Sequence, residues 1–249
     1  MRMRHGCSIL LSTVLGFGAV ASAASAELKV LTSRAIATVL DVVGPQFEQA
    51  TRNKLTVVTG FSPELVRRIN AGEPFDILAA PPPVLDTMIK AGELNAGTRT
   101  LLVRSDVGVG VRAGAPKPDI STVAAFKQAL LNAKSIAYLP TPGVPQVLER
   151  LGVADAIKSK STVPETDIVS ELVAKGEVEL GIVVMSQLLT TPGVDLVGPL
   201  PDDIKVTTIF GGAVSASSNV PDAARALLQF LRTEEAVKVI RKQGMVPAS

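Results

Sequence analysis

Histidine, cysteine and tryptophan are almost missing from this sequence of 249 residues. It contains no tryptophan, one histidine (His5), one cysteine (Cys7) and one tyrosine (Tyr138). His5 and Cys7 lie within the first 26 residues, so the rest of the sequence has neither an imidazole nor a thiol. It therefore has no disulfide, no Ser-His or Cys-His nucleophile and no zinc site of the usual kind. Acid, lysine, serine and tyrosine chemistry stays open, but no spacing motif supports it.

The first 26 residues have the pattern of a secretory signal peptide. Arg2 and Arg4 precede a short apolar run at 9–21, which small residues follow. The run falls short of the roughly 20 residues that a membrane span needs. We expect export to the periplasm, with cleavage after Ala23 or Ala26 and a mature chain that begins at residue 27 in the second case. An uncleaved membrane anchor is the alternative.

A strong charge of either sign is also missing. Once Arg2 and Arg4 are removed, basic and acidic residues are equal in number, and aromatic residues make up only 3% of the sequence. A nucleic-acid surface needs basic patches and often stacking rings. We therefore expect no nucleic-acid partner, and we also expect no cofactor and no bound metal.

What the sequence does contain is an alternation of short β-rich runs with helical segments. Such alternation predicts βαβ units and a mixed, mostly parallel sheet. The first series has predicted strands at 28–32, 54–60 and 75–80 and helices at 36–51, 63–71 and 83–90. After a long extended stretch at 100–114, a second series has strands at 135–139 and 178–184 and helices at 126–133, 144–152 and 165–176. A further strand at 206–214 and two helices within 221–244 complete the chain.

This order predicts an α/β protein of two lobes. After a signal peptide at 1–26, the first lobe holds 27–112 and the return segment 205–249, and the second lobe is the insertion at 113–204. Ligands of such sheets bind beyond the carboxyl ends of the strands, where helices begin. We therefore expect a ligand cleft between the lobes, with hinge closure on the ligand.

Several predicted strand-to-helix junctions carry hydroxyl groups or glycine. Helix starts attract anions through free N–H groups and the helix dipole, so a cleft built from them predicts an oxyanion site. Each residue also has a structural interpretation: Ser62 and Thr166 as helix caps, and Arg34 as a surface cation or a partner of a nearby acid. Asp167 would repel an anion, and we interpret it as structural. The candidates are Ser33, Arg34, Ser62, Thr141, Gly143 and Thr166.

The mature chain resembles the periplasmic molybdate-binding proteins of ABC importers, which have the type II periplasmic binding fold. The resemblance runs through LKVLTSRAIATVLDVVGPQFEQAT, VTGFSPELVRRINAGEPFDILAA, LVAKGEVELGIVV and the closing GGAVSASSNVPDAARALLQFLRTEEAVKVIRKQGM. The stretch LVRRINAGEPFDI is its most specific part. The resemblance implies a monomeric solute-binding protein that binds a small anion and delivers it to a permease in the inner membrane.

The oxyanion pocket of that family matches this sequence only in part. One family serine falls on Ala35, with Ser33 two residues earlier, and a second falls on Ser62. The family's tyrosine falls on Val184, and its second-lobe amides fall between Thr141 and Gly143 and near Thr166. Because hydroxyl donors are lost and the guanidinium of Arg34 is gained, a small carboxylate is an alternative to molybdate or tungstate.

We therefore predict a binding protein for a small oxyanion or carboxylate, and not an enzyme. A periplasmic sensor or adaptor that uses the same cleft is one alternative. An enzyme on the same scaffold is another, and it is less favoured because no acid or lysine stands at the strand ends expected to face the cleft.

Overall fold

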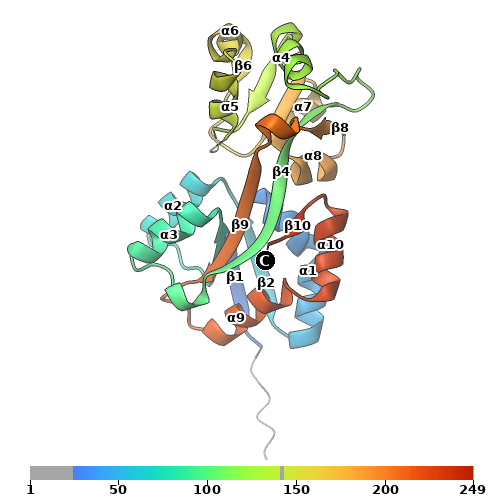
Figure 1. Ribbon diagram of the computed structural model, residues 1–249. Coiled ribbons are helices and arrows are strands. Elements are labelled where there is room, and N and C mark those ends of the chain that lie inside the picture. Colours follow the sequence, from blue (N-terminus) through green and yellow to red (C-terminus); the bar gives the residue numbers. More distant parts are fainter. Residues whose placement is uncertain (1–24, 141–142, 249) are drawn as a thin grey trace, which may run out of the picture.

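Two long antiparallel strands, β4 (Thr100–Arg112) and β9 (Thr207–Val214), run through both lobes of the molecule (Figure 1). The computed structural model describes residues 25–140 and 143–248. Most of the predicted signal peptide and the candidate residue Thr141 lie outside the described residues. No helix within these two ranges is long and apolar enough to cross a membrane.

The first lobe is a sheet with helices on both faces. Its strands run in the order β2-β1-β3-β9-β4, with β1 parallel to β2 and β3, and β9 antiparallel to β3. The strand bounds are β1 (Glu27–Thr32), β2 (Lys54–Thr59), β3 (Ile77–Ala80) and β10 (Val246–Pro247), which pairs with β4. The helices are α1 (Arg34–Thr51), α2 (Ser62–Asn70), α3 (Pro82–Lys90), α9 (Pro221–Phe230) and α10 (Glu234–Lys242), with the 3-10 turn η1 (Ala96–Thr98).

Alternation along β1 explains why both faces of this sheet are covered. Leu28 and Val30 point into one cluster of buried residues, which also contains Val39 of α1 and Ile240 of α10. Leu31 points to the opposite face, where it joins a second cluster with residues of α2 and α3. Figure 1 shows α2 and α3 on one side of the sheet and α1 and α10 on the other.

The second lobe repeats the plan on a smaller scale. Its strands run in the order β4-β7-β5-β6, with β5 parallel to β6 and β7, and with β8 paired to β4. The strand bounds are β5 (Ile136–Tyr138), β6 (Ser161–Thr162), β7 (Leu180–Val184) and β8 (Val194–Pro199). The helices are α4 (Val123–Asn132), α5 (Val144–Arg150), α6 (Ala154–Ile157), α7 (Val169–Lys175) and α8 (Met185–Thr190), with the 3-10 turns η2 (Lys158–Lys160) and η3 (Asp202–Ile204).

Glycines at alternate positions of β4 allow β8 and α8 to pack closely on this strand. A Cβ atom on Gly108 would lie 2.7 Å from the carbonyl oxygen of Gly198 in β8, and one on Gly110 would lie 2.5 Å from Leu188 Cδ2 in α8. Their role is therefore close packing, because a strand that meets backbone and helix at this distance has no room for side chains.

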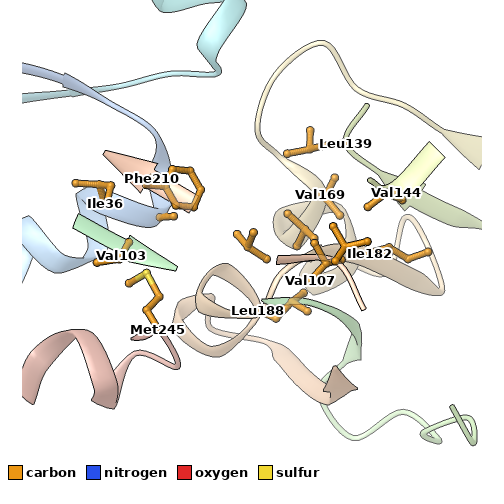
Figure 2. Packing of buried hydrophobic residues seen from close by; sticks show 14 of the residues in the cluster. Ile36, Val103, Val107, Leu139, Val144, Val169, Ile182, Leu188, Phe210 and Met245 are labelled. Carbon is orange, nitrogen blue, oxygen red and sulfur yellow. The ribbon is translucent and has the colours of Figure 1, made fainter. Parts of the chain in front are cut away.

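The main cluster of buried residues continues from one lobe into the other. Figure 2 shows Ile36, Val103 and Phe210 beside one another and Val169, Ile182 and Leu188 in the neighbouring group. β4 contributes Val103 to the first group and Val107 to the second. The two lobes therefore share a core along the strands that join them.

The predicted two-lobed α/β fold is confirmed, and several elements differ from the sequence prediction. α7 begins at Val169 rather than near 165, and α4 begins at Val123 rather than at 126. Strands β6, β8 and β10 and helices α6 and α8 are not among the predicted elements. The lobe boundaries at 112/113 and 204/205 remain our proposal.

Candidate functional site

A small chamber lies between the lobes, at the carboxyl ends of their parallel strands. Its volume is about 50 Å³, which is room for about three or four water molecules. The junctions that follow β1, β2 and β3 meet those that follow β5 and β7 here, as expected for open α/β sheets. We call it the interlobe chamber; it is lined by Ser33, Phe61, Ser62, Pro81, Leu139, Asp167, Val183, Val184, Gln187, Thr208 and Phe210.

Ser33 and Ser62 bring two helix starts to the chamber. Ser33 is the N-cap residue of α1, yet its side chain makes no capping hydrogen bond, and its buried Oγ has no partner among the described residues. Ser62 is the first residue of α2, whose N-cap is Phe61, so the interpretation of Ser62 as an ordinary cap is wrong. The two hydroxyl groups are therefore available beside N–H groups that have no partner within their helices.

Asp167 is the acid that faces the chamber. It lies in the turn before α7 and is only 8% exposed. Its Oδ2 accepts a hydrogen bond of 2.8 Å from Gln187 Nε2, while its Oδ1 is buried with no partner in the described part of the chain. From the sequence, we interpret Asp167 as a structural residue at a helix start; the helix begins two residues later, and Asp167 lines the chamber together with residues of the first lobe.

The surroundings of Asp167 favour its neutral form. Burial raises the pKa of Asp167 to about 6, and the negative charge of Glu171 acts in the same direction. The positive charge of Arg34 and the hydrogen bond from Gln187 lower the pKa but do not cancel the effect of burial. A carboxyl group with a pKa near neutrality can both remove and return a proton, which is a frequent property of acid–base groups in active sites.

Arg34 pairs with an acid of the other lobe. Its Nη1 lies 2.6 Å from Glu171 Oε1 in α7, and its Nε is buried without a partner among the described residues. Both side chains are about one third exposed, and both also line a wider groove of about 570 Å³. The structure therefore gives Arg34 an acidic partner and leaves one of its donors unpaired.

The remaining predicted residues lie in different surroundings. Ala35 is fully buried in the main core cluster. Thr166 is exposed, whereas its neighbour Asp167 lines the chamber. Gly143 adopts a φ of 114° and donates its N–H to Gln146 Oε1 over 2.7 Å. Val184, at the position of the family's tyrosine, lines the chamber. The structure thus brings Ser33 and Ser62 to one chamber, with Arg34 bound to Glu171.

Gln187 is the residue that sequence reasoning missed. It lies in α8, which follows β7 directly, and it is only 3% exposed. No motif marks it, because α8 has six residues and its N-cap, Val184, makes no side-chain cap. The available signal is a glutamine three residues after an apolar strand, where a polar side chain that becomes buried needs a partner.

Comparison with known proteins places this geometry in a family. The family described as bacterial extracellular solute-binding protein matches residues 28–246. The chain is 34% identical to a protein of a Pseudomonas species named aconitate isomerase, over 97% of this chain and 94% of that protein. It is 26% identical to the molybdate-binding protein ModA of Escherichia coli K12, over 97% of this chain and 98% of the other.

Solved structures agree on the fold. The periplasmic molybdate-binding protein of Azotobacter vinelandii matches 89% of this chain and 100% of its own, with a TM-score of 0.76 and 19% identity. The resemblance to molybdate-binding proteins and to the type II periplasmic fold is therefore confirmed.

The expectation that this chain is not an enzyme is contradicted. A relative that matches nearly its whole length has the name of an isomerase. The structural argument behind the expectation also fails, because Asp167 is an acid at a cleft-facing junction. From the sequence, Asp167 is assigned to a helix start and a structural role, and so it is not counted among cleft-facing acids.

Proposed function

This chain belongs to the bacterial extracellular solute-binding protein family, and from that premise we propose that it is an isomerase of small unsaturated polycarboxylates such as aconitate. Asp167 is the proposed proton-transferring group. The observation that carries the proposal is its carboxyl group, which is buried in the interlobe chamber and whose Oδ1 has no partner among the described residues. Burial raises the pKa of this carboxyl group to about 6. The isomerase-named relative supports the substrate class.

The proposed reaction is a proton shift along an allylic carboxylate. The ionised Asp167 removes a proton from the methylene carbon that lies next to both a carboxylate and the double bond. The electron pair of the broken C–H bond spreads over the allyl unit and its carboxylate. Asp167 then returns the proton to the other end of the allyl unit, and the double bond forms at the former methylene. No atom or electron is gained or lost, so Asp167 ends as it began.

The helix starts of α1 and α2 suit the negative charges of such a substrate. Ser33 Oγ and the free N–H groups beside it and beside Ser62 offer donors without a counter-charge. The unpaired Nε of Arg34 offers a charged donor for a second carboxylate. These residues would hold the substrate and stabilise the charge that develops on its reacting carboxylate.

Substrate entry requires the lobes to separate. A tricarboxylate is larger than the chamber of about 50 Å³, so this closed arrangement must open to admit it. β4 and β9 join the lobes and are the natural hinge. Closure over the substrate would then exclude water from the reacting carbon atoms.

Binding of a tetrahedral oxyanion is the second candidate function. The size of the chamber and the relatives named molybdate-binding proteins favour it. An ionised Asp167 disfavours it, because a buried carboxylate repels a dianion. In that case the partner would be an ABC permease. For either function we propose export of a monomer to the periplasm, directed by residues 1–26.

Proton NMR of purified residues 27–249 with cis-aconitate in D₂O tests the proposal. We expect formation of the trans isomer and exchange of carbon-bound hydrogen for deuterium. Asp167→Asn should reduce the rate about 10²- to 10⁴-fold. Asp76→Asn is the matched control. Asp76 is a half-buried acid that does not line the chamber, and its Oδ1 accepts a hydrogen bond from Ser218 Oγ. Calorimetry with molybdate on the same samples tests the second function; molybdate binding without isomerisation would overturn the first.

A further inference from the structure

We propose that Gln187 is the positioning residue of Asp167, and that its amide group supports the acid in both protonation states. This inference deepens the proposed function, and its kinetic part depends on that function. Its structural part does not, because the titration of Asp167 can be followed in the protein without any ligand.

The contact between the two side chains is buried and direct. Gln187 Nε2 donates to Asp167 Oδ2 over 2.8 Å, and the two residues are 3% and 8% exposed. This hydrogen bond occupies one carboxyl oxygen and leaves Oδ1 without a partner among the described residues. Gln187 thereby selects Oδ1 as the atom that can exchange a proton with a substrate in the chamber.

The second polar atom of Gln187 is also unpaired. Its Oε1 is buried with no partner in the described part of the chain. A primary amide has a donor end and an acceptor end, whereas an ionised carboxylate only accepts and a protonated one also donates. Nε2 therefore suits the ionised Asp167, and when the proton is on Oδ1 it can still donate to Oδ2, which remains an acceptor in the protonated acid. An acid–base group needs a partner that serves both states, because an unmade buried hydrogen bond is costly.

The backbone of Gln187 is held in place from several sides. Its carbonyl oxygen accepts hydrogen bonds from Thr191 N and Thr191 Oγ1, at 3.0 and 2.8 Å. The preceding residue, Ser186, accepts a hydrogen bond from Ser105 of β4. The next residue, Leu188, packs where β4 has Gly110. With the helix fixed, the side chain moves only by rotation of its own bonds.

The other groups that face Asp167 fix the sign of the expected change. Arg34 of α1 lowers the pKa of Asp167, Glu171 of α7 raises it, and the hydrogen bond from Gln187 lowers it. Gln187→Met keeps the length of the side chain but removes the donor. The pKa of Asp167 should therefore rise above about 6.

Carbon-13 NMR titration of labelled aspartate carboxyl groups in the ligand-free protein is the test, with Asp167→Asn to assign the signal. We expect an upward shift of the Asp167 titration in Gln187→Met. Gln243→Met is the control, since Gln243 makes comparable hydrogen bonds to Thr38 in the first lobe. Its Asp167 titration should match that of the wild type. If the titration is also unchanged in Gln187→Met, the inference is overturned.

A second variant covers the case in which Gln187→Met does not fold, and a kinetic measurement distinguishes failure of this inference from failure of the proposed function. If Gln187→Met does not fold, Gln187→Glu replaces it, and two adjoining carboxyl groups should then titrate in two separate steps; a single unchanged step would overturn the inference. In the isomerase assay we expect Gln187→Met to reduce kcat about tenfold to a hundredfold, as for loss of one hydrogen bond to a charged group, with KM little changed. If the titration of Asp167 shifts in Gln187→Met but the wild-type protein does not isomerise cis-aconitate, the inference about Gln187 stands and the proposed function is refuted.

Discussion

Arg34 and Glu171 form an ion pair across the two lobes, with 2.6 Å between Arg34 Nη1 and Glu171 Oε1. Arg34 begins α1 in the first lobe, and Glu171 lies in the first turn of α7 in the second. It is the only ion pair between the lobes in residues 25–140 and 143–248. Glu171 Oε2 also accepts a hydrogen bond from Ser170, which in turn accepts one from Thr191. This anchoring fixes the second-lobe end of the pair.

Glu171→Gln should lower the pKa of Asp167. The substitution removes a negative charge that raises this pKa and leaves the positive charge of Arg34 uncompensated. Weaker closure of the lobes would act in the same direction, because a better hydrated carboxyl group ionises more easily. Carbon-13 NMR titration measures the change. Asp86→Asn, which breaks the ion pair with Arg99, is the control and should leave it unaltered. An upward shift in Glu171→Gln would contradict the prediction.

Asp167→Asn should stabilise the protein at neutral and alkaline pH. The folded pKa of Asp167, about 6, is above the usual value of 3.8, so the folded protein binds this proton more tightly than the unfolded chain. The favourable contribution is complete below about pH 4 and is lost as the pH rises through about 6. At pH 7.5 the ionised acid costs up to about 3 kcal/mol of unfolding free energy, which asparagine avoids.

Urea denaturation of the wild type and Asp167→Asn from pH 4 to pH 8 measures this difference. We expect the curves of unfolding free energy to diverge between about pH 4 and pH 6 and to run parallel above that range. Equal stability of both proteins at pH 7.5 would show that Asp167 is not buried as described.

Gly143→Ala should destabilise the protein more than Gly72→Ala does. Both glycines have positive φ, 114° and 83°, so alanine is strained at each. At Gly143 the added Cβ would also lie 2.5 Å from Val206 Cγ1, whereas at Gly72 it meets nothing within 4 Å. We expect a loss of about 1–3 kcal/mol at Gly143 and about 1 kcal/mol at Gly72. Thermal denaturation compares the two, and equal losses would mean that Val206 yields without cost.

Local sequence pattern predicted the fold well because each lobe is built from regular units. The strands and helices around Ser33 and Ser62 follow from apolar periodicity and from the position of Pro63 at a helix start. The sequence therefore predicts these two hydroxyl groups as candidates, and the structure places both at the interlobe chamber.

The chemistry of Asp167 could not be predicted in this way. Its pKa depends on burial under the other lobe and on Arg34, which is far away in the sequence. The partner of Asp167, Gln187, lies on a six-residue helix without a capping signal. The sequence predicts that Asp167 begins a helix, and its burial, which depends on the contact between the lobes, does not follow from local pattern.

The discontinuous first lobe also sets the order in which the protein can fold. Strand β3 needs β9 as its antiparallel neighbour, with Ile77 opposite Val214, and the whole second lobe lies between them in the sequence. Pairing over such a separation forms slowly, because a long loop must close first. During synthesis from the N-terminus, β5, β6 and β7 of the second lobe are complete before β9 exists. The edges of β3 and β4 that β9 later covers are therefore exposed in the nascent chain and need protection from wrong partners.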